Sequence, residues 1–285
     1  MLSIGANVAA LVLLSALIHA SWNAIIKSDA DRLLSFGLVM LVGAVMGLVA
    51  IPFTQVPAIG AWPWLIGSAV IHTFYYFFLL RAYAHGDLSH VYPIARGIAP
   101  LLVAGIAGGL VGERLALREG LGVLLVSTGV VGLAFARGLP RPGEGRALIY
   151  AVLTGITIAG YTVVDGMGAR AAGDAFGYIA WLNVLEGPWL FVVAVIRRRG
   201  ATIPYLRQYW WRGTIGGVIA TIGYGIAIWA LSVSPMAHVT ALRETSSLFG
   251  ALIGAYILKE SLGVRRVIAA AVMVSGLLMM NLRLG

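Results

Sequence analysis

Long apolar segments alternate with short polar segments along the whole chain. A helix of about 20 apolar residues spans the hydrocarbon core of a bilayer. The segment lengths, and the lack of a sustained two-residue alternation, favour helices over transmembrane strands. We predict an all-α polytopic membrane protein. The ten expected transmembrane helices are 4–26, 32–51, 62–84, 88–111, 118–136, 146–166, 176–196, 211–232, 237–258 and 263–281.

The polar residues of one stretch recur in the same order about half a chain later. Residues 88–132 and 236–279 each contain a polar start, an apolar span, an acidic motif and a second apolar span with a glycine. The matched pairs are His90 with His238, Arg96 with Arg243, Glu113 with Glu260, Leu115 with Leu262, Arg118 with Arg265 and Gly129 with Gly276. Chance matches rare polar residues in order less readily than leucines. We therefore predict two homologous halves, 1–138 and 139–285.

Five spans in each half would make the repeat inverted. After an odd number of crossings the second half enters the membrane from the opposite side. Such a 5+5 inverted repeat is one of the architectures of secondary transporters, whose sites lie near the membrane midplane between the repeats.

Composition supports a membrane location. The chain is 60% hydrophobic and only 11% charged, with a mean hydropathy of +0.93, far from soluble averages. The absence of cysteine excludes disulfides and thiolate metal ligands. Close helix packing is predicted at four glycine pairs with a four-residue spacing. These pairs are Gly43/Gly47, Gly105/Gly109, Gly213/Gly217 and Gly250/Gly254.

The net charge of +9 reflects loops that face one side of the membrane, and we expect no nucleic-acid partner. Fourteen of the Lys and Arg residues fall in one set of loops, and four fall in the other set and the termini. By the positive-inside rule, both termini are predicted on the periplasmic side of a bacterial inner membrane.

Span count, repeat and motif together resemble the EamA-type family of the drug/metabolite transporter superfamily. The motif is G-E-R-L at 112–115 and K-E-S-L at 259–262, and the resemblance covers nearly the whole chain. It implies export or exchange of small metabolites, and the arrangement is most similar to bacterial exporters of aromatic and other neutral amino acids. The second half departs from the pattern, with Lys259 in place of Gly112 and no proline matching Pro93 or Pro100.

Polar residues in the first half suggest a cavity. His19, Trp22 and Asn23 form one stripe of the first span, which must face protein or water. The stripe could line a cavity or only make hydrogen bonds between helices. His72, Tyr75 and Tyr76 share a face of the third span.

Tyr76 matches Tyr224 in the second half at the repeat offset. Two such tyrosines flanking the repeat axis could form an aromatic substrate pocket, or they could be ordinary aromatic packing.

The second half adds the ionisable candidates. Tyr161 aligns with Trp22, and span seven contains Trp181 and Glu186, with Pro188 expected to interrupt that helix. Glu186 lies near mid-membrane and could bind a substrate ammonium or a proton. Asp165 lies near the end of its span, where a solvated carboxylate is the simpler interpretation.

Three matched pairs of the repeat have a structural interpretation. Arg96 and Arg243 could each bind a substrate carboxylate or tie the repeats together, and we slightly favour the tie. His90 and His238 are expected at the surface. Glu113 and Glu260 are expected to accept hydrogen bonds at the start of the helix that follows each of them.

No cofactor or metal site is expected. The chain has no P-loop, H-E-x-x-H or G-x-S-x-G pattern, and its five histidines are not spaced as a metal cluster. A membrane enzyme would need a constellation such as His72 with Glu186, which nothing else supports. The expected partners are a small-molecule substrate and the lipid bilayer, with the protein a monomer or a homodimer through spans five and ten.

Overall fold

The computed structural model describes residues 4–27, 29, 31–86, 88–136, 144–256 and 263–281. Within these residues the chain is helical and has no strand, which confirms the all-α prediction. The α-helices are α1 (Ala6–Lys27), α2 (Arg32–Ala50), α3 (Trp62–His85), α4 (Leu88–Ile106), α5 (Leu117–Phe135), α6 (Gly145–Ala171), α7 (Ala175–Arg198), α8 (Thr202–Val233), α9 (Met236–Arg243), α10 (Thr245–Tyr256) and α11 (Val264–Asn281).

Seven stretches of the described chain are long and apolar enough to cross a membrane. One of them, Ala175–Val233, includes both α7 and α8, because the short helix η4 (Arg199–Ala201) joins the two without a break. The ninth predicted span is interrupted at Glu244, between α9 and α10. The polytopic membrane class is therefore supported, while the count of ten spans remains a prediction.

The helix interruption expected at Pro188 was wrong. Helix α7 continues from Ala175 to Arg198 with Pro188 inside it. A proline removes one backbone hydrogen bond, and packed transmembrane helices tolerate that loss. By contrast, α4 ends in a π-helical turn, η3 (Ala107–Val111), followed by Gly112 at φ +74°. This left-handed conformation favours glycine, which explains the glycine of the G-E-R-L motif.

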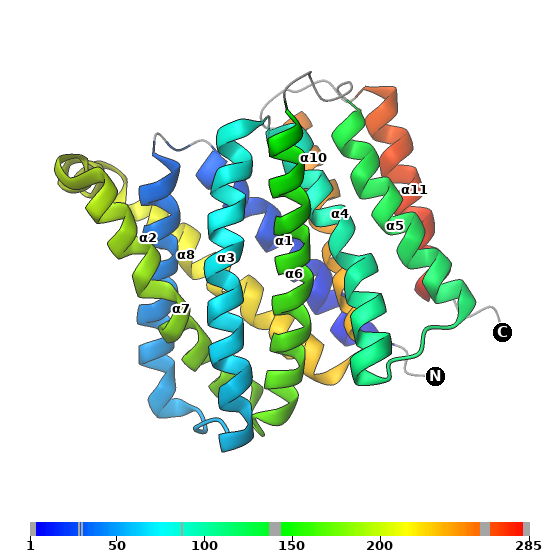
Figure 1. Ribbon diagram of the computed structural model, residues 1–285, viewed down its shortest axis with the longest axis horizontal. Coiled ribbons are helices and arrows are strands. Elements are labelled where there is room, and N and C mark those ends of the chain that lie inside the picture. The colour runs from blue at the N-terminus through cyan, green and yellow to red at the C-terminus, as the bar shows by residue number, and fades with distance from the viewer. Residues whose placement is uncertain are drawn as a thin grey trace.

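Helices from the two sequence halves interlock (Figure 1). The most extensive contacts join α2 with α7, α5 with α11, and α3 with α6. Helix α1 packs on α8 in turn. If α1 corresponds to α6, and α3 to α8, the α3–α6 contact is the image of the α8–α1 contact. The arrangement is compatible with a two-fold repeat.

Glycines set the distance between several helices. A Cβ atom on Gly47 of α2 would come within 2.5 Å of the Ala180 carbonyl oxygen of α7, and one on Gly217 of α8 within 2.6 Å of Val42. The pairs Gly43/Gly47 and Gly213/Gly217 are thus packing positions, as predicted. Gly105 and Gly109 have no such neighbour within 4 Å in the described chain, so the prediction was wrong for that pair. The pair Gly250/Gly254 stays a prediction, because Gly254 lies outside the residues whose surroundings the structure describes.

The predicted peripheral helices do lie at one flank of the bundle. Helices α5 and α11 pack side by side on the right of Figure 1. Gly122 of α5 and Gly276 of α11 meet backbone to backbone, since a Cβ on Gly276 would be 2.6 Å from the Gly122 carbonyl oxygen. Their outer faces expose large apolar side chains such as Leu124 and Ile268, as a lipid-facing surface would.

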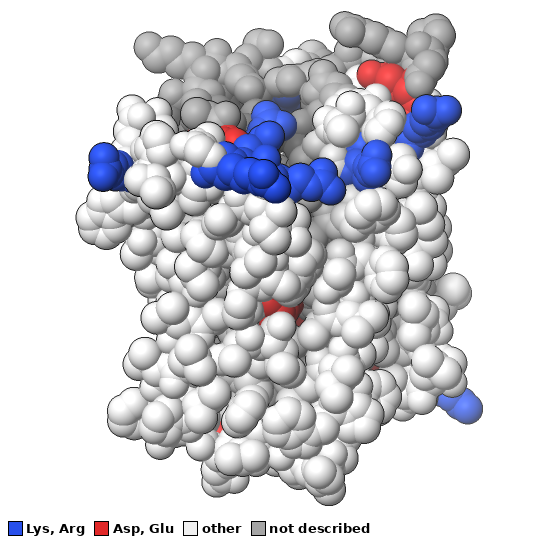
Figure 2. All heavy atoms as spheres, turned by 60° about the vertical axis from the view of Figure 1, so that its left-hand side comes forward, with Lys and Arg blue, Asp and Glu red and all other residues white. Residues whose placement is uncertain are grey.

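Charge differs between the two ends of the molecule, whereas core clusters join the halves at both. Lys and Arg side chains form a band near one end, above a broad apolar belt (Figure 2). Towards the other end, where α1 begins and α11 ends, one core cluster joins helices of both halves through Val12, Val103, Val163, Leu231 and Met236. At the basic end, one cluster joins α3, α4 and α5 to α6, and another joins α2 to α7 and α8. The two halves are therefore packed together along the bundle.

Candidate functional site

A cavity lies between the halves and encloses about 650 Å3 of empty space, part of which is open to solvent. Seven helices contribute to it: α1, α2, α3, α6, α7, α8 and α9. Its lining residues are His19, Trp22, Phe36, Val39, Met40, Gly43, His72, Tyr75, Tyr76, Tyr161, Asn183, Glu186, Ala220, Thr221, Tyr224 and Arg243.

The cavity extends towards the basic end. Trp22 lies five residues before the end of α1, and Phe36 four residues after the start of α2, both ends being at the basic band. At 1.5 Å per residue they lie roughly 6–8 Å from these helix ends. Lining residues on α3 and α6 are all ten or more residues from the ends of those helices on the opposite side. The lining therefore reaches nearest the basic end at Trp22 and Phe36, whereas His72 and Glu186 lie about midway along α3 and α7.

Nine of the eleven residues proposed from sequence line this cavity. Asn23 and Trp181 do not. The Asn23 amide donates a hydrogen bond to the carbonyl oxygen of His19 in its own helix, at 2.7 Å. Trp181 packs edge-to-face on Trp62, with ring centroids 5.2 Å apart. Asn23 and Trp181 are therefore on helices that line the cavity, but on faces beside the lining one.

The sequence reasoning missed the contribution of α2. Phe36, Val39, Met40 and Gly43 line the cavity from this helix. None of them is ionisable, so the lining face of α2 resembles a lipid-facing one in sequence. The same holds for Ala220 on α8. Asn183 is a polar residue in the same apolar span as Glu186, so the sequence could have predicted it as a lining residue.

Aromatic rings form the walls of the cavity. The imidazole of His72 stacks on Tyr161, with centroids 4.1 Å apart and planes at 19°. Tyr75 meets Tyr161 edge-to-face at 5.5 Å. On the side nearer the basic end, Trp22 contacts both His19 and Phe36. Such walls suit a flat or apolar group, and the phenol and imidazole edges add hydrogen-bonding positions.

Two side chains of opposite charge face this aromatic space. Glu186 is 3% exposed, and its Oε2 lies 3.3 Å from Nδ1 of His72. Arg243 is 6% exposed, and its guanidinium carbon lies 5.4 Å from the centre of the Tyr224 ring. A buried charge is costly without a partner, so both side chains are candidates to pair with charged groups of a ligand.

The two repeat-related arginines have different surroundings. Arg96 pairs with Glu244, with Nη2 2.9 Å from Oε1 and Nε donating to Oε2 at 3.2 Å. It also donates to the backbone oxygen of Arg243 at 3.5 Å. This arrangement ties α4 to the junction of α9 and α10. The geometry thus favours the structural role for Arg96 and leaves Arg243 lining the cavity.

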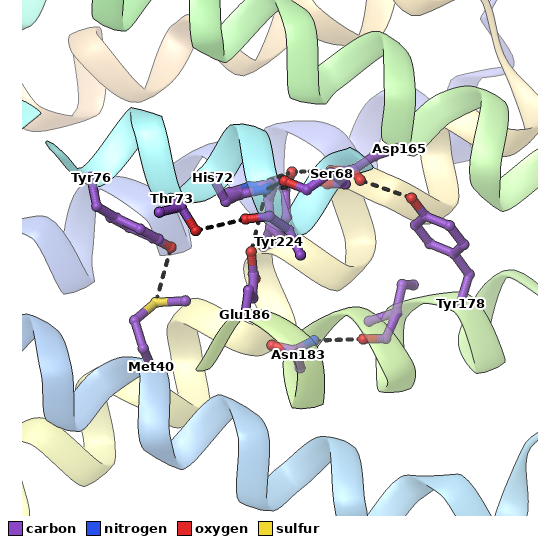
Figure 3. A network of polar contacts seen from close by, with 12 residues as sticks. Met40, Ser68, His72, Thr73, Tyr76, Asp165, Tyr178, Asn183, Glu186 and Tyr224 are labelled. Carbon is purple, nitrogen blue, oxygen red and sulfur yellow. Dashed lines mark hydrogen bonds and ion pairs between the residues drawn. The ribbon is translucent and has the colours of Figure 1, made fainter. Parts of the chain in front are cut away.

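Asp165 is a correction to the sequence interpretation. A solvated carboxylate was expected, but the side chain is fully buried. It accepts hydrogen bonds from the hydroxyls of Tyr178 at 3.0 Å and Tyr224 at 2.5 Å (Figure 3). Distance from a helix end was a poor guide, because α7 and α8 cover this part of α6. Asp165 lies behind the cavity wall that Tyr224 forms.

The histidines expected at the surface also differ. His238 is 2% exposed, with Nε2 3.5 Å from the Glu119 carboxylate, and His90 is half-buried. Helix α9 is buried along its whole length, so its first turn is not a surface turn.

Glu113 does organise a helix start, but not that of the next helix. Its Oε2 accepts a hydrogen bond from the backbone N–H of Met236, the first residue of α9, at 2.8 Å. Its Oε1 pairs with Arg170 of α6 at 2.8 Å. Arg170 donates in turn to the carbonyl oxygens of Leu231 and Ser234. Glu113 therefore links the first half to the second at the end away from the basic band; Glu260 lies outside the described residues.

Within the part of the chain that the structure describes, no group of three or more His, Asp or Glu side chains could hold a metal ion. The chemistry available in the cavity is hydrogen bonding, ion pairing and aromatic contact.

Together, fold and site define a helical membrane protein with a polar, aromatic cavity between two interlocked halves. The chain belongs to the EamA-like transporter family, whose model matches residues 7–135 and again residues 145–282. The two matches fall on the two halves inferred from the polar repeat, and they are compatible with it. No match to the chain is found among curated proteins.

A solved structure described only as a crystal structure of a protein supports the fold. It is 17% identical in sequence, with a TM-score of 0.74, over 99% of this chain and 98% of the other. At this identity the likeness concerns the fold alone.

Proposed function

We propose that this protein is a secondary transporter that exports small metabolites, in particular aromatic and other neutral amino acids, across the bacterial inner membrane by alternating access. The ten spans of a 5+5 inverted repeat would be α1 to α8, then α9 with α10 as one span, then α11. The basic band would face the cytoplasm and both termini the periplasm.

The observation that supports the proposal is a single cavity with a carboxylate, a guanidinium group and aromatic walls. An amino acid has an ammonium group, a carboxylate and a side chain. Glu186 would bind the ammonium, Arg243 would bind the carboxylate in a forked geometry, and the rings around His72 and Trp22 would contact the side chain. Opposite charges at two places in this aromatic cavity favour a zwitterion over a ligand of one charge.

Export is the direction of transport that the family resemblance suggests. Trp22 and Phe36 carry the cavity lining towards the basic end, and Glu113 ties the halves together at the other end. Both features are compatible with a state that loads substrate from the cytoplasm. Export would require the halves to rock until the opposite end opens.

The test is uptake of labelled amino acids into liposomes that contain the purified protein. Saturable uptake of labelled phenylalanine, blocked by excess unlabelled amino acid, is the expected result. Recovering the label unchanged from the lumen would exclude the rival class, a membrane enzyme, which would alter it. Saturable uptake of other metabolites or drugs, with none of any amino acid, would instead favour the alternative substrates of this family.

The residue assignment is tested with matched pairs of variants. Glu186→Gln and Arg243→Ala remove the two cavity charges, whereas Glu144→Gln and Arg207→Ala change the same residue types outside the cavity lining. The first pair should lose at least tenfold in uptake, since hydrogen bonds to charged groups contribute about 1.5–3 kcal/mol each. Normal transport by both cavity variants would overturn the assignment.

A further inference from the structure

Four titratable side chains from four helices form a continuous chain from the cavity into the protein (Figure 3). Glu186 of α7 lies 3.3 Å from Nδ1 of His72 on α3. Nε2 of His72 lies 3.4 Å from the hydroxyl of Tyr224 on α8. That hydroxyl lies 2.5 Å from Oδ2 of Asp165 on α6. Glu186 lines the cavity and Asp165 does not, so the chain connects the substrate space to a buried carboxylate.

Both nitrogens of His72 have neighbours that suit a protonated and an unprotonated form. Nδ1 lies 3.0 Å from the carbonyl oxygen of Ser68, which only accepts, and 3.1 Å from the Ser68 hydroxyl, which can also donate. The Glu186 carboxylate beside it accepts when ionised. Nδ1 can therefore give a proton to Glu186 and then accept from the Ser68 hydroxyl, while Nε2 takes a proton from Tyr224.

Tyr224 has one hydroxyl proton and two neighbours, so two arrangements satisfy the contacts. In the first, Asp165 is ionised, Tyr224 donates to it, and the protonated Nε2 of His72 donates to the phenol oxygen. In the second, Asp165 holds the proton and donates to the phenol oxygen, and Tyr224 donates to a neutral Nε2. The number of protons and the net charge are the same in both. They differ only by one shift of protons through the Tyr224 hydroxyl.

The chain leads from mid-membrane towards the end opposite the basic band. Asp165 is six residues from the end of α6, or about 9 Å. Glu186 is eleven residues from the start of α7 at the same end, or about 17 Å. Asp165 is therefore the member nearest to the predicted periplasmic face.

We propose that Asp165, Tyr224, His72 and Glu186 form a proton relay that makes the transporter a proton antiporter. This rests on the proposed export function. A proton arriving from the periplasmic side binds Asp165. Asp165 then gives a proton to the Tyr224 oxygen, the Tyr224 hydroxyl gives its own proton to Nε2 of His72, and Nδ1 of His72 gives its proton to Glu186. Because Glu186 cannot hold a proton and a substrate ammonium at once, the proton displaces the substrate on the outside. On the inside, substrate binding displaces the proton, which leaves to the cytoplasm.

The groups around the relay are mostly uncharged. Tyr178 of α7 donates to the second oxygen of Asp165, while Tyr75 and Tyr76 of α3 and Tyr161 of α6 surround the His72 ring. His19 of α1 lines the same cavity. Arg243 of α9 lies over the Tyr224 ring. The charge of the relay itself comes from two carboxylates and one imidazole. Adding or removing a proton changes this buried charge, and binding of a charged substrate can offset the change.

The experiment compares exchange with net transport in liposomes. Counterflow of labelled against unlabelled phenylalanine needs no net proton movement. Net uptake, with the membrane potential clamped and the lumen about one pH unit more acidic than outside, should reach about tenfold accumulation if one proton leaves per substrate. A pH-sensitive dye trapped in the lumen should report alkalinisation when phenylalanine is added outside without a gradient.

Asp165→Asn is the informative variant, because the amide cannot take up the proton. It should retain counterflow and lose accumulation, its ratio falling to about one. Asp174→Asn is the matched control, an acid-to-amide change in the N-cap of α7, where Asn caps as well as Asp. The control should accumulate phenylalanine like the unaltered protein.

The two proposals fail differently. No counterflow by the unaltered, folded protein would overturn the amino acid substrate. Counterflow without gradient-driven accumulation or a dye response would overturn the relay alone, and so would full accumulation by Asp165→Asn. Should Asp165→Asn not fold, the dye measurement on the unaltered protein still decides between coupled and uncoupled transport.

Discussion

Gly276 of α11 lies so close to α5 that an added Cβ atom would meet the Gly122 carbonyl oxygen at 2.6 Å. The clash is with backbone, which cannot rotate away. We expect Gly276→Ala to lower stability by about 1–3 kcal/mol, the usual range for overpacking. Thermal unfolding in detergent measures it. A Cβ atom on Gly120 of α5 would meet no described residue within 4 Å, so Gly120→Ala should be neutral. Equal effects of the two changes would contradict the close packing.

Gly43 of α2 lines the cavity, and an added Cβ atom would also meet close neighbours there. A Cβ atom there would lie 2.9 Å from Oδ1 of Asn183 and 3.0 Å from Oγ1 of Thr221. Gly43→Ala should therefore weaken transport of tryptophan and phenylalanine more than that of alanine. Competition for labelled uptake by these amino acids gives the comparison. Gly225→Ala, whose nearest neighbour is 3.5 Å away, serves as the control, and a uniform loss for all three substrates would argue against a steric effect.

Single residues were predictable where chemistry made them unusual. Glu186, His72 and Arg243 stood out as ionisable groups within apolar segments, and all three line the cavity. Met40 and Gly43 did not, because an apolar residue facing a cavity looks like one facing lipid. Asp165 was misjudged because burial near a helix end depends on which helices cover it.

Among the helices, Arg96 of α4 and Glu244 at the α9–α10 junction form a polar tie in which both side chains are buried. Removing one partner leaves the other charge buried. Arg96→Met should cost about 3–5 kcal/mol, and Arg96→Met with Glu244→Met should recover most of that loss. A double-mutant cycle by thermal unfolding measures the coupling. If the double variant is as unstable as the sum of the single changes, the pair does not act as one unit.

Helix positions were predicted well from hydropathy, and helix interruptions were not. The interruption at Glu244 has no proline, while Pro188 lies inside a continuous α7. A transmembrane helix ends or continues according to what its freed backbone groups and side chains meet in neighbouring helices. For Glu244 that partner is Arg96, about half a chain away, which local sequence cannot reveal.

For the whole molecule, the contact of Glu113 with Arg170 and α9 is expected to hold the predicted periplasmic end closed. Arg170 is partly exposed, so its pair with Glu113 contributes about 1 kcal/mol, enough for about a fivefold shift of a two-state equilibrium. Arg170→Ala should favour the outward-open state. The chain has no cysteine, so Ala220→Cys in the cavity can report the change.

The readout is labelling of Ala220→Cys by a membrane-impermeant maleimide added on the predicted periplasmic side. Adding Arg170→Ala should speed labelling several-fold, whereas adding Arg207→Ala should leave the rate unchanged. Faster labelling from the cytoplasmic side instead would show that the cavity opens in the other direction.

The global arrangement was only partly accessible to sequence reasoning. The polar repeat indicated two halves, and the family model matches each of them. The repeat did not indicate that Glu113 of the first half would bind the start of α9 in the second half. Contacts between halves depend on how the bundle closes, which a pattern along one helix does not contain.

The two glycine contacts lie on opposite flanks of the bundle, α2 with α7 on the left of Figure 1 and α5 with α11 on the right. Each joins one helix of the first half to one of the second. Backbones in direct contact can rotate about the contact but cannot separate as side-chain interfaces do. If the halves rock, a line through these two contacts is the natural pivot. Both contacts lie no more than five residues from the helix ends away from the basic band, so rotation about this line would move the basic ends of these helices furthest.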